Sequence, residues 1–235
     1  MKKLYEEKEV LFAVAWILIY CLLIAPIRGQ YGDGSLALLA AMSLFAVAIT
    51  VFVKKYNLEE KYGLKRWPAD PKRYLYFIPM WILAVGNMWD GVSLNYKGMS
   101  LVYATLSMTI VGYVEEMLFR GFLFKAMLKE NGTVPAIIVS SLTFGIGHIV
   151  NLFSGQATLE TLVQIIFAIS WGFLFTMVYY KCESLLPCIV AHALVDVSSL
   201  FGADTKTGAM LYVCATIVTA IIYCIYLAKL KKEER

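Results

Sequence analysis

The chain has 235 residues, of which 60% are hydrophobic and 16% are charged. Soluble domains contain about 45–50% apolar and about 25% charged residues, so this composition excludes a large soluble domain and favours an integral membrane protein. The net charge of +4 does not indicate nucleic-acid binding, because the basic residues lie between apolar runs and form no long stretch with interleaved aromatic residues.

Eight apolar runs follow one another along the chain, separated by polar, glycine- and proline-containing turns. A helix that crosses the roughly 30 Å hydrocarbon core of a bilayer needs about 20 mostly apolar residues. The sequence therefore predicts an all-α, polytopic membrane protein of about eight transmembrane helices, forming a single domain over residues 1–235. The expected spans are Val10–Ile27, Ser35–Val53, Tyr74–Trp89, Met99–Leu128, Val134–Phe153, Leu159–Tyr180, Ser184–Leu200 and Ala209–Ala228.

The basic residues predict the orientation of these spans. If both termini are cytoplasmic, most of the 21 Lys and Arg residues fall in cytoplasmic tails and loops, with the largest group in the loop Lys54–Arg73. Cytoplasmic loops of membrane proteins carry such an excess. We therefore expect a multi-pass protein of the cell membrane with both termini in the cytoplasm.

Three of the spans contain ionisable side chains, which are costly at bilayer depth and survive where they face the protein interior or a water-filled cavity. Helical spacing of four residues predicts that two pairs of these residues share a face. The helical rise puts them at roughly 12–21 Å from the ends of their spans, so we expect them to share one buried site. The residues of interest are Glu115, Glu116 and Arg120 in the fourth span, Phe144 and His148 in the fifth, and His192 and Asp196 in the seventh.

These side chains suit peptide hydrolysis, which needs an activated water and a group that stabilises the developing oxyanion. Glu115 or Glu116 can act as the general base, one histidine can position the water, and a second histidine held by a carboxylate can stabilise the oxyanion. A divalent metal such as zinc can do the same work, because Glu, His and Asp are zinc ligands, although no HExxH motif occurs. The expected cofactor is therefore none or one divalent metal, with Glu115, His148, His192 and Asp196 as candidate ligands.

The three motifs, Glu115-Glu116-xxx-Arg120, Phe144-xxx-His148 and His192-xxx-Asp196, resemble those of the CPBP family. That family groups CAAX-type prenyl endopeptidases with bacterial bacteriocin-processing and immunity (Abi) proteins. The motifs occur in the family's order over a core of roughly residues 99–200. The resemblance implies eight transmembrane helices around a buried active-site cavity open toward the cytoplasm. It also implies that Glu115 acts on water with His148, with His192 and Asp196 on the oxyanion side. Members are described both as metalloproteases and as metal-free glutamate proteases.

One position departs from the prenyl endopeptidases, which have Asn where this chain has Asp196. Asn can donate a hydrogen bond to an oxyanion, whereas an ionised Asp only accepts one. We therefore expect Asp196 to orient and charge His192 or to bind a metal. Arg120 and Phe144 are expected to have structural or substrate-binding roles, and Asn151, one turn after His148, is interpreted as an interface or loop residue outside the site.

The predicted function is that of an intramembrane endopeptidase acting on a membrane-associated protein or peptide. A bacteriocin-like peptide or a signalling precursor is a better substrate prediction than a prenylated protein. The alternative is a non-enzymatic immunity or scaffold protein or a proton-coupled transporter, since buried Glu, His and Asp also serve proton relays. The expected partners are the substrate and the lipid bilayer, and no nucleic acid.

Overall fold

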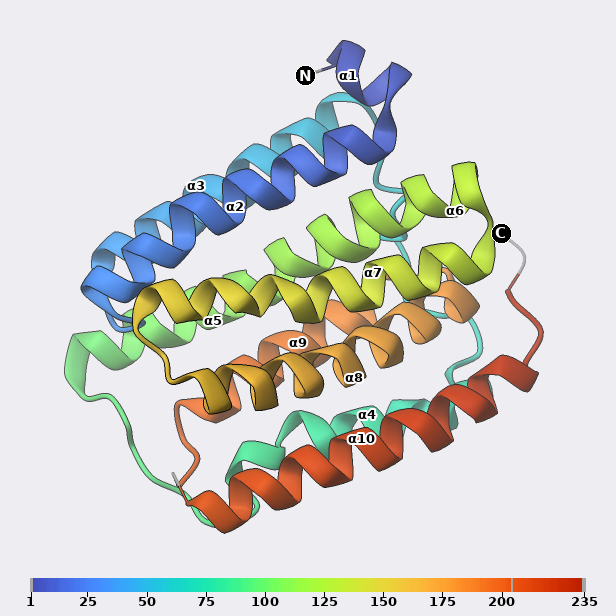
Figure 1. Ribbon diagram of the computed structural model, residues 1–235. Helices are drawn as coiled ribbons and strands as arrows, with labels where there is room; N and C mark the ends of the chain where they lie inside the picture. The colour runs from blue at the N-terminus through green and yellow to red at the C-terminus, as the bar shows by residue number, and fades with distance from the viewer. Residues whose placement is uncertain (1, 204, 234–235) are drawn as a thin grey trace.

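The computed structural model describes residues 2–203 and 205–233, without the side chains of 153 and 154. The predicted all-α class is confirmed, because these residues form a bundle of helices (Figure 1). The ends of the predicted 1–235 domain and Asp204 lie outside the described residues. The α-helices are α1 (Lys2–Glu7), α2 (Glu9–Tyr31), α3 (Leu36–Lys55), α4 (Ile78–Ala84), α5 (Gly98–Glu116), α6 (Lys125–Asn131), α7 (Thr133–Gly147), α8 (Thr158–Cys182), α9 (Leu186–Ser199) and α10 (Lys206–Lys229).

Four helical segments of other geometry connect or extend these helices. One of them, the π-helix η3, lies between α5 and α6 and makes them a continuous helical rod over residues 98–131. The 3₁₀ helix η4 extends α7, and two further 3₁₀ helices flank α4. They are η1 (Pro71–Phe77), η2 (Gly86–Met88), η3 (Met117–Phe124) and η4 (His148–Ser154).

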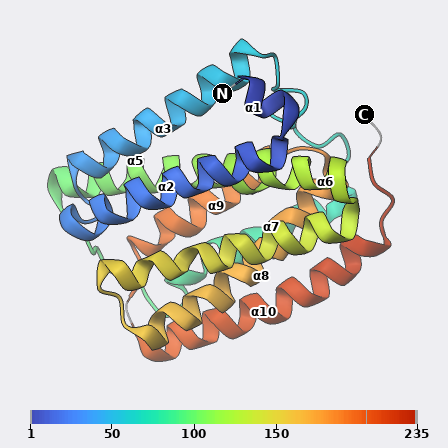
Figure 2. The ribbon, with the colours of Figure 1, turned by 45° about the horizontal axis from the view of Figure 1, so that its top comes forward.

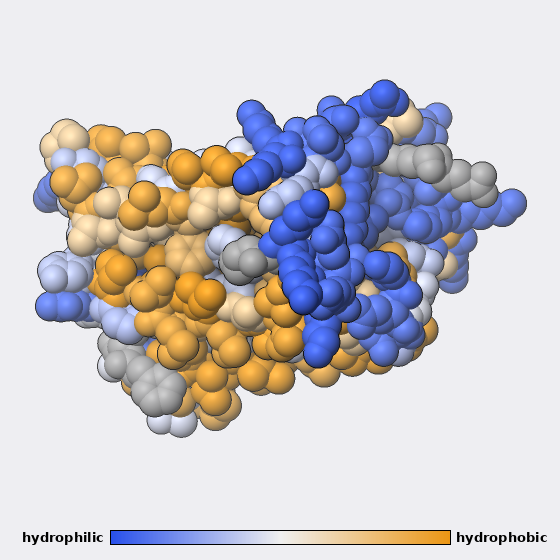
Figure 3. Space-filling model, turned by 90° about the horizontal axis from the view of Figure 1, so that it is seen from above, coloured by the Kyte–Doolittle hydropathy of each residue, from blue (hydrophilic) through white to orange (hydrophobic). Residues whose placement is uncertain are grey.

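Six helices in the described part of the chain are long and apolar enough to cross a membrane. They are α2, α3, the rod formed by α5, η3 and α6, α7 with the first residues of η4, α8, and α10. Outward-facing apolar side chains such as Leu22, Leu44 and Ile222 are 73%, 72% and 64% exposed, as expected of helices that face lipid. Figure 3 shows the same division, with a wide hydrophobic region beside one strongly hydrophilic end.

The remaining two predicted spans are helical but short, so the predicted count of eight exceeds the six helices of spanning length. Helix α9 has 14 residues and rises only about 21 Å, which is less than the hydrocarbon thickness. In the segment Tyr74–Trp89, Leu75, Tyr76 and Phe77 have positive φ angles, and only the seven residues of α4 are α-helical. Hydropathy counts apolar residues, but it does not detect a break in the backbone.

Close helix contacts at glycines bring together the four helices that carry the motifs or border them. A Cβ atom built on Gly112 of α5 would lie 2.6 Å from the backbone nitrogen of Ala193 in α9. A Cβ on Gly172 of α8 would lie 2.7 Å from the carbonyl oxygen of Ser141 in α7. Only glycine permits such approaches, so these two contacts fix how closely α5 meets α9 and α7 meets α8.

Helix α2 lies between α3 and α7 in both ribbon views (Figures 1 and 2). It packs against η3 and η4 as well as against α3. It therefore lies beside the two segments that carry Arg120 and His148, although it precedes them by about a hundred residues in the chain.

Candidate active site

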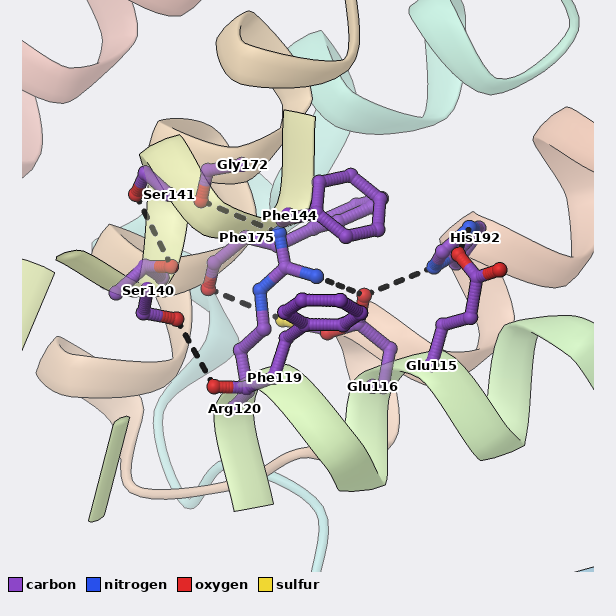
Figure 4. Close-up of polar contacts among 12 residues, drawn as sticks. Glu115, Glu116, Phe119, Arg120, Ser140, Ser141, Phe144, Gly172, Phe175 and His192 are labelled. Carbon is purple, nitrogen blue, oxygen red and sulfur yellow. Dashed lines mark hydrogen bonds and ion pairs between the residues drawn. The ribbon is translucent and has the colours of Figure 1, made fainter. Parts of the chain in front are cut away.

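A fully buried charged centre lies where α5, η3 and α9 meet. Glu116 and Arg120 have no exposed side-chain surface, and Arg120 Nη1 lies 2.8 Å from Glu116 Oε1. His192 Nδ1 lies 2.8 Å from the same oxygen (Figure 4). Because a carboxylate accepts hydrogen bonds, the shared proton belongs to Nδ1, and this contact sets the orientation of the ring. The spacing-based pairing of Glu116 with Arg120 is thus present in the structure.

Two aromatic rings hold this centre from both sides. The guanidinium carbon of Arg120 lies 4.2 Å from the centroid of Phe144 and 5.4 Å from that of Phe175. His192 stacks on Phe175 at 5.5 Å and meets Phe144 edge-on at 5.6 Å. Arg120 Nη2 also donates to the carbonyl oxygen of Gly172 at 3.3 Å (Figure 4). Phe144 therefore contacts Arg120 and His192 at once.

The other ring nitrogen of His192, Nε2, faces two further carboxylates. It lies 3.7 Å from Glu115 Oε2 and 3.6 Å from Asp196 Oδ2. These distances exceed those of direct hydrogen bonds. The Nε2 side of the ring is therefore less tightly packed than the Nδ1 side, and three carboxylates surround a single imidazole.

His148 begins η4, and its Nδ1 lies 3.2 Å from the carbonyl oxygen of Phe144, one turn earlier. The His148 ring meets the Phe144 ring edge-on at 5.5 Å. His148 borders a hollow that also contacts Glu115, and a second hollow that also contacts His192 and Asp196. The structure thus brings the seven sequence-predicted residues together, with the other six gathered around Phe144.

A third hollow extends the first two toward the surface. It shares Arg28 and Asn151 with the Glu115 hollow, and it reaches the exposed residues Gly29 and Gly155. These residues lie at the bundle end where α2 turns into α3, whereas both chain termini lie at the other end (Figure 1). The resemblance, together with cytoplasmic termini, predicts an opening at the bundle end that holds α1 and the end of α10. The side on which the cavity opens and the orientation of the termini stay predictions.

Three site-lining residues were missed by the sequence analysis. The hydroxyl of Tyr20 donates to Glu115 Oε1 at 2.7 Å. Arg28 pairs with Asp33 at 2.5 Å and lines the same hollow. Asn151, interpreted above as an interface residue, lines two of the hollows and donates to Gln164 at 2.8 Å. Tyr20 and Asn151 carried a detectable signal, because a polar group in an apolar span needs a hydrogen-bond partner.

The two histidines among the candidate metal ligands point their Nδ1 atoms to protein partners in the described part of the chain. Within the described residues, no three His, Cys, Asp or Glu side chains converge on a point that suits an ion. His192 directs Nδ1 to Glu116, and His148 directs Nδ1 to a backbone carbonyl. Both contacts engage Nδ1 and leave Nε2 of each ring for other partners, so the divalent metal considered in the sequence analysis stays a prediction.

The comparisons with known proteins agree with the position of the motifs. Residues 97–198 match the family model described as type II CAAX prenyl endopeptidase Rce1-like, and this segment contains all three motifs. No curated protein and no solved structure matches the chain. Together with the six helices of spanning length, the match identifies a multi-pass membrane protein. Over residues 97–198, the chain is similar to the type II CAAX prenyl endopeptidase Rce1-like family, and this match supports a place among the CPBP/CAAX intramembrane proteases.

Proposed function

We propose that the chain is a glutamate-dependent intramembrane endopeptidase that uses Glu115 to activate water. The observation that carries this proposal is the contrast between the two neighbouring glutamates. Glu116 is fully buried and already accepts hydrogen bonds from Arg120 and His192. Glu115 is 12% exposed, borders the hollow shared with His148, and faces His192 Nε2. Of the two carboxylates, only Glu115 has access to a water molecule and a substrate.

The proposed reaction follows from this geometry. Glu115 removes a proton from a water held beside His148, and the water oxygen attacks the carbonyl carbon of the peptide bond. His192, held through Nδ1 by Glu116, presents a protonated Nε2 to the developing oxyanion. Asp196 and Glu115, at 3.6 and 3.7 Å from Nε2, favour the charged imidazole. When the tetrahedral intermediate collapses, Glu115 returns the proton to the leaving amine, and both peptide fragments are released.

The proposed substrate is a protein or peptide in or at the cell membrane, such as a bacteriocin-like peptide or a signalling precursor. Two observations support a membrane-associated substrate. The hollows lie among spanning helices, and much of the lining of the first is apolar, including Ile24, Phe119 and Val150. The distribution of basic residues supports cytoplasmic termini as part of the proposal.

A peptidase assay in detergent or liposomes tests the proposal. Fluorescence-quenched hydrophobic peptides, with and without a prenylated C-terminal cysteine motif, serve as probes. We expect wild-type protein to cleave at least one of them, and Glu115→Ala, His148→Ala and His192→Ala to abolish cleavage while each protein is still produced. Glu160→Gln is the matched control, because Glu160 is exposed at the start of α8 and should keep full activity.

Two outcomes contradict the proposal: no cleavage of any probe by wild type, or wild-type turnover by Glu115→Ala. Either outcome favours the alternative of a non-enzymatic immunity or scaffold protein or a proton-coupled transporter. The match to a protease family argues against that alternative.

A further inference from the structure

The base proposed above is held by a residue that lies outside the family-matched segment. Tyr20 is near the middle of α2, and the match begins at residue 97. Its hydroxyl nevertheless donates to Glu115 Oε1 at 2.7 Å. Four other residues of α2 line the same hollow, so α2 forms one of its walls; they are Cys21, Ile24, Ala25 and Arg28.

The ring of Tyr20 is fixed on its other side. Tyr20 is 7% exposed, and its ring meets Phe45 of α3 edge-on at 5.6 Å. A tyrosine side chain has few rotatable bonds, so packing of the ring directs the hydroxyl. Hydrogen bonds from a hydroxyl to a carboxylate are short and about twice as strong as neutral ones. The bond therefore holds one oxygen of Glu115 in place.

This contact divides the work between the two carboxylate oxygens of Glu115. Oε1 is engaged by Tyr20, whereas Oε2 faces the His192 ring at 3.7 Å. A carboxylate fixed through one oxygen presents the lone pairs of the other in a constant direction. Rotation of the Glu115 side chain would break the bond to Tyr20, so that bond selects the orientation that a general base requires.

We propose that Tyr20 is a positioning residue that orients Glu115 to remove a proton from the attacking water. The inference rests on the proposed function, since it assigns Glu115 the role of base. It also assigns part of the active site to α2, outside the segment that carries the three motifs.

The chain offers a matched control for a purely structural role. Tyr113 lies on the same helix as Glu115, and its hydroxyl forms a 2.9 Å hydrogen bond with Thr50 of α3. Tyr113 does not line the Glu115 hollow. Tyr20→Phe and Tyr113→Phe each remove one interhelical hydroxyl bond, and only the first removes a contact with the base.

Steady-state kinetics of the two variants test the proposal. We expect Tyr20→Phe to lower kcat roughly ten- to a hundredfold, the size of one hydrogen bond to a charged group, with KM changed by less than about twofold. Tyr113→Phe should leave both constants within about twofold of wild type. An unchanged kcat in Tyr20→Phe, or equal losses in both variants, overturns the role of Tyr20 while active wild type upholds the proposed function.

A second measurement does not depend on activity. In thermal unfolding, the losses caused by Tyr20→Phe and Glu115→Ala should be clearly less than additive in the double variant, because both remove the same contact. The losses caused by Tyr113→Phe and Glu115→Ala should add. Additive losses for the Tyr20 pair contradict the proposed coupling, whether or not a cleavable substrate has been found.

Discussion

The two faces of the His192 ring differ sharply. On the Nδ1 face, Glu116 lies 2.8 Å from Nδ1 and is itself 2.8 Å from Arg120. Neither Glu116 nor Arg120 has exposed side-chain surface. On the Nε2 face, Glu115 and Asp196 stand 3.7 and 3.6 Å away, and their side chains are 12% and 22% exposed. Consecutive residues of a helix point about 100° apart, so two adjacent glutamates reach opposite environments. The Nδ1 side, here called the closed face, suits a structural role. The Nε2 side, here called the open face, suits catalysis.

The largest expected effect is at the open face. Glu115→Gln should lower kcat roughly a thousandfold or more, within the range for loss of a general base, because the amide cannot accept a proton. The melting temperature should change little, since the side chain keeps its shape. Kinetics and thermal unfolding of the same preparation check both statements. A collapse of stability instead would mean that Glu115 belongs to the structural face.

The next effect is at the closed face. Arg120→Met should destabilise the fold by about 3–5 kcal/mol, because it removes the guanidinium from the buried Glu116, which then keeps only its contact with His192. Chemical unfolding in detergent measures the change. The double variant Arg120→Met with Glu116→Gln should recover part of the loss, since it removes the buried charge that the guanidinium compensated. A double variant that is no more stable than Arg120→Met would contradict the ion-pair explanation.

A smaller effect is expected at Asp196. Asp196→Asn should lower kcat about tenfold, because it removes a negative charge 3.6 Å from Nε2 while the new amide supplies a donor for the oxyanion. Asp196→Leu should lower kcat further, since leucine supplies neither a negative charge nor a hydrogen-bond donor. If the kcat of Asp196→Asn equals or exceeds that of the wild type, the charge of Asp196 makes no contribution to turnover.

The smallest effect is expected outside both faces, at Glu183 in the link between α8 and α9. Burial would raise the pKa of Glu183, but hydrogen bonds from Lys125 and Lys232 outweigh it and hold the pKa below its usual value. Because the pKa of Glu183 is lower in the folded than in the unfolded chain, its ionisation stabilises the fold at pH values above the unfolded pKa near 4.5. This stabilisation is lost as the pH falls through the folded pKa. Glu183→Gln should therefore lose at most about 1 kcal/mol at pH 7 and progressively less in acid.

Turnover is the control for that variant. Glu183→Gln should keep wild-type kcat, because Glu183 lines none of the three hollows described above. A large loss of activity would show that the open face depends on the link between α8 and α9.

Much of this arrangement followed from local rules. Helical spacing predicted the Glu116–Arg120 pair. The unfavourable free energy of ionisable side chains in a bilayer predicted that Glu115, His148 and His192 would lie together. The contact of Tyr20 with Glu115 joins residues 95 positions apart, and no periodicity reports such a contact. The backbone break at residues 75–77 was missed because apolar residues there adopt left-handed conformations that composition does not predict.

The π-helical segment η3 has a consequence for the rod over residues 98–131. Its wider turns change the rotational phase between the residues before and after it. Upstream, the rod presents Glu115 and Glu116 to His192; downstream, Lys125 and Lys129 meet Glu183 and Glu9. This change in direction lets one helix contact two separate sets of neighbours, His192 before η3 and Glu183 and Glu9 after it. In a uniform α-helix, the direction of the first set of side chains would fix that of the second.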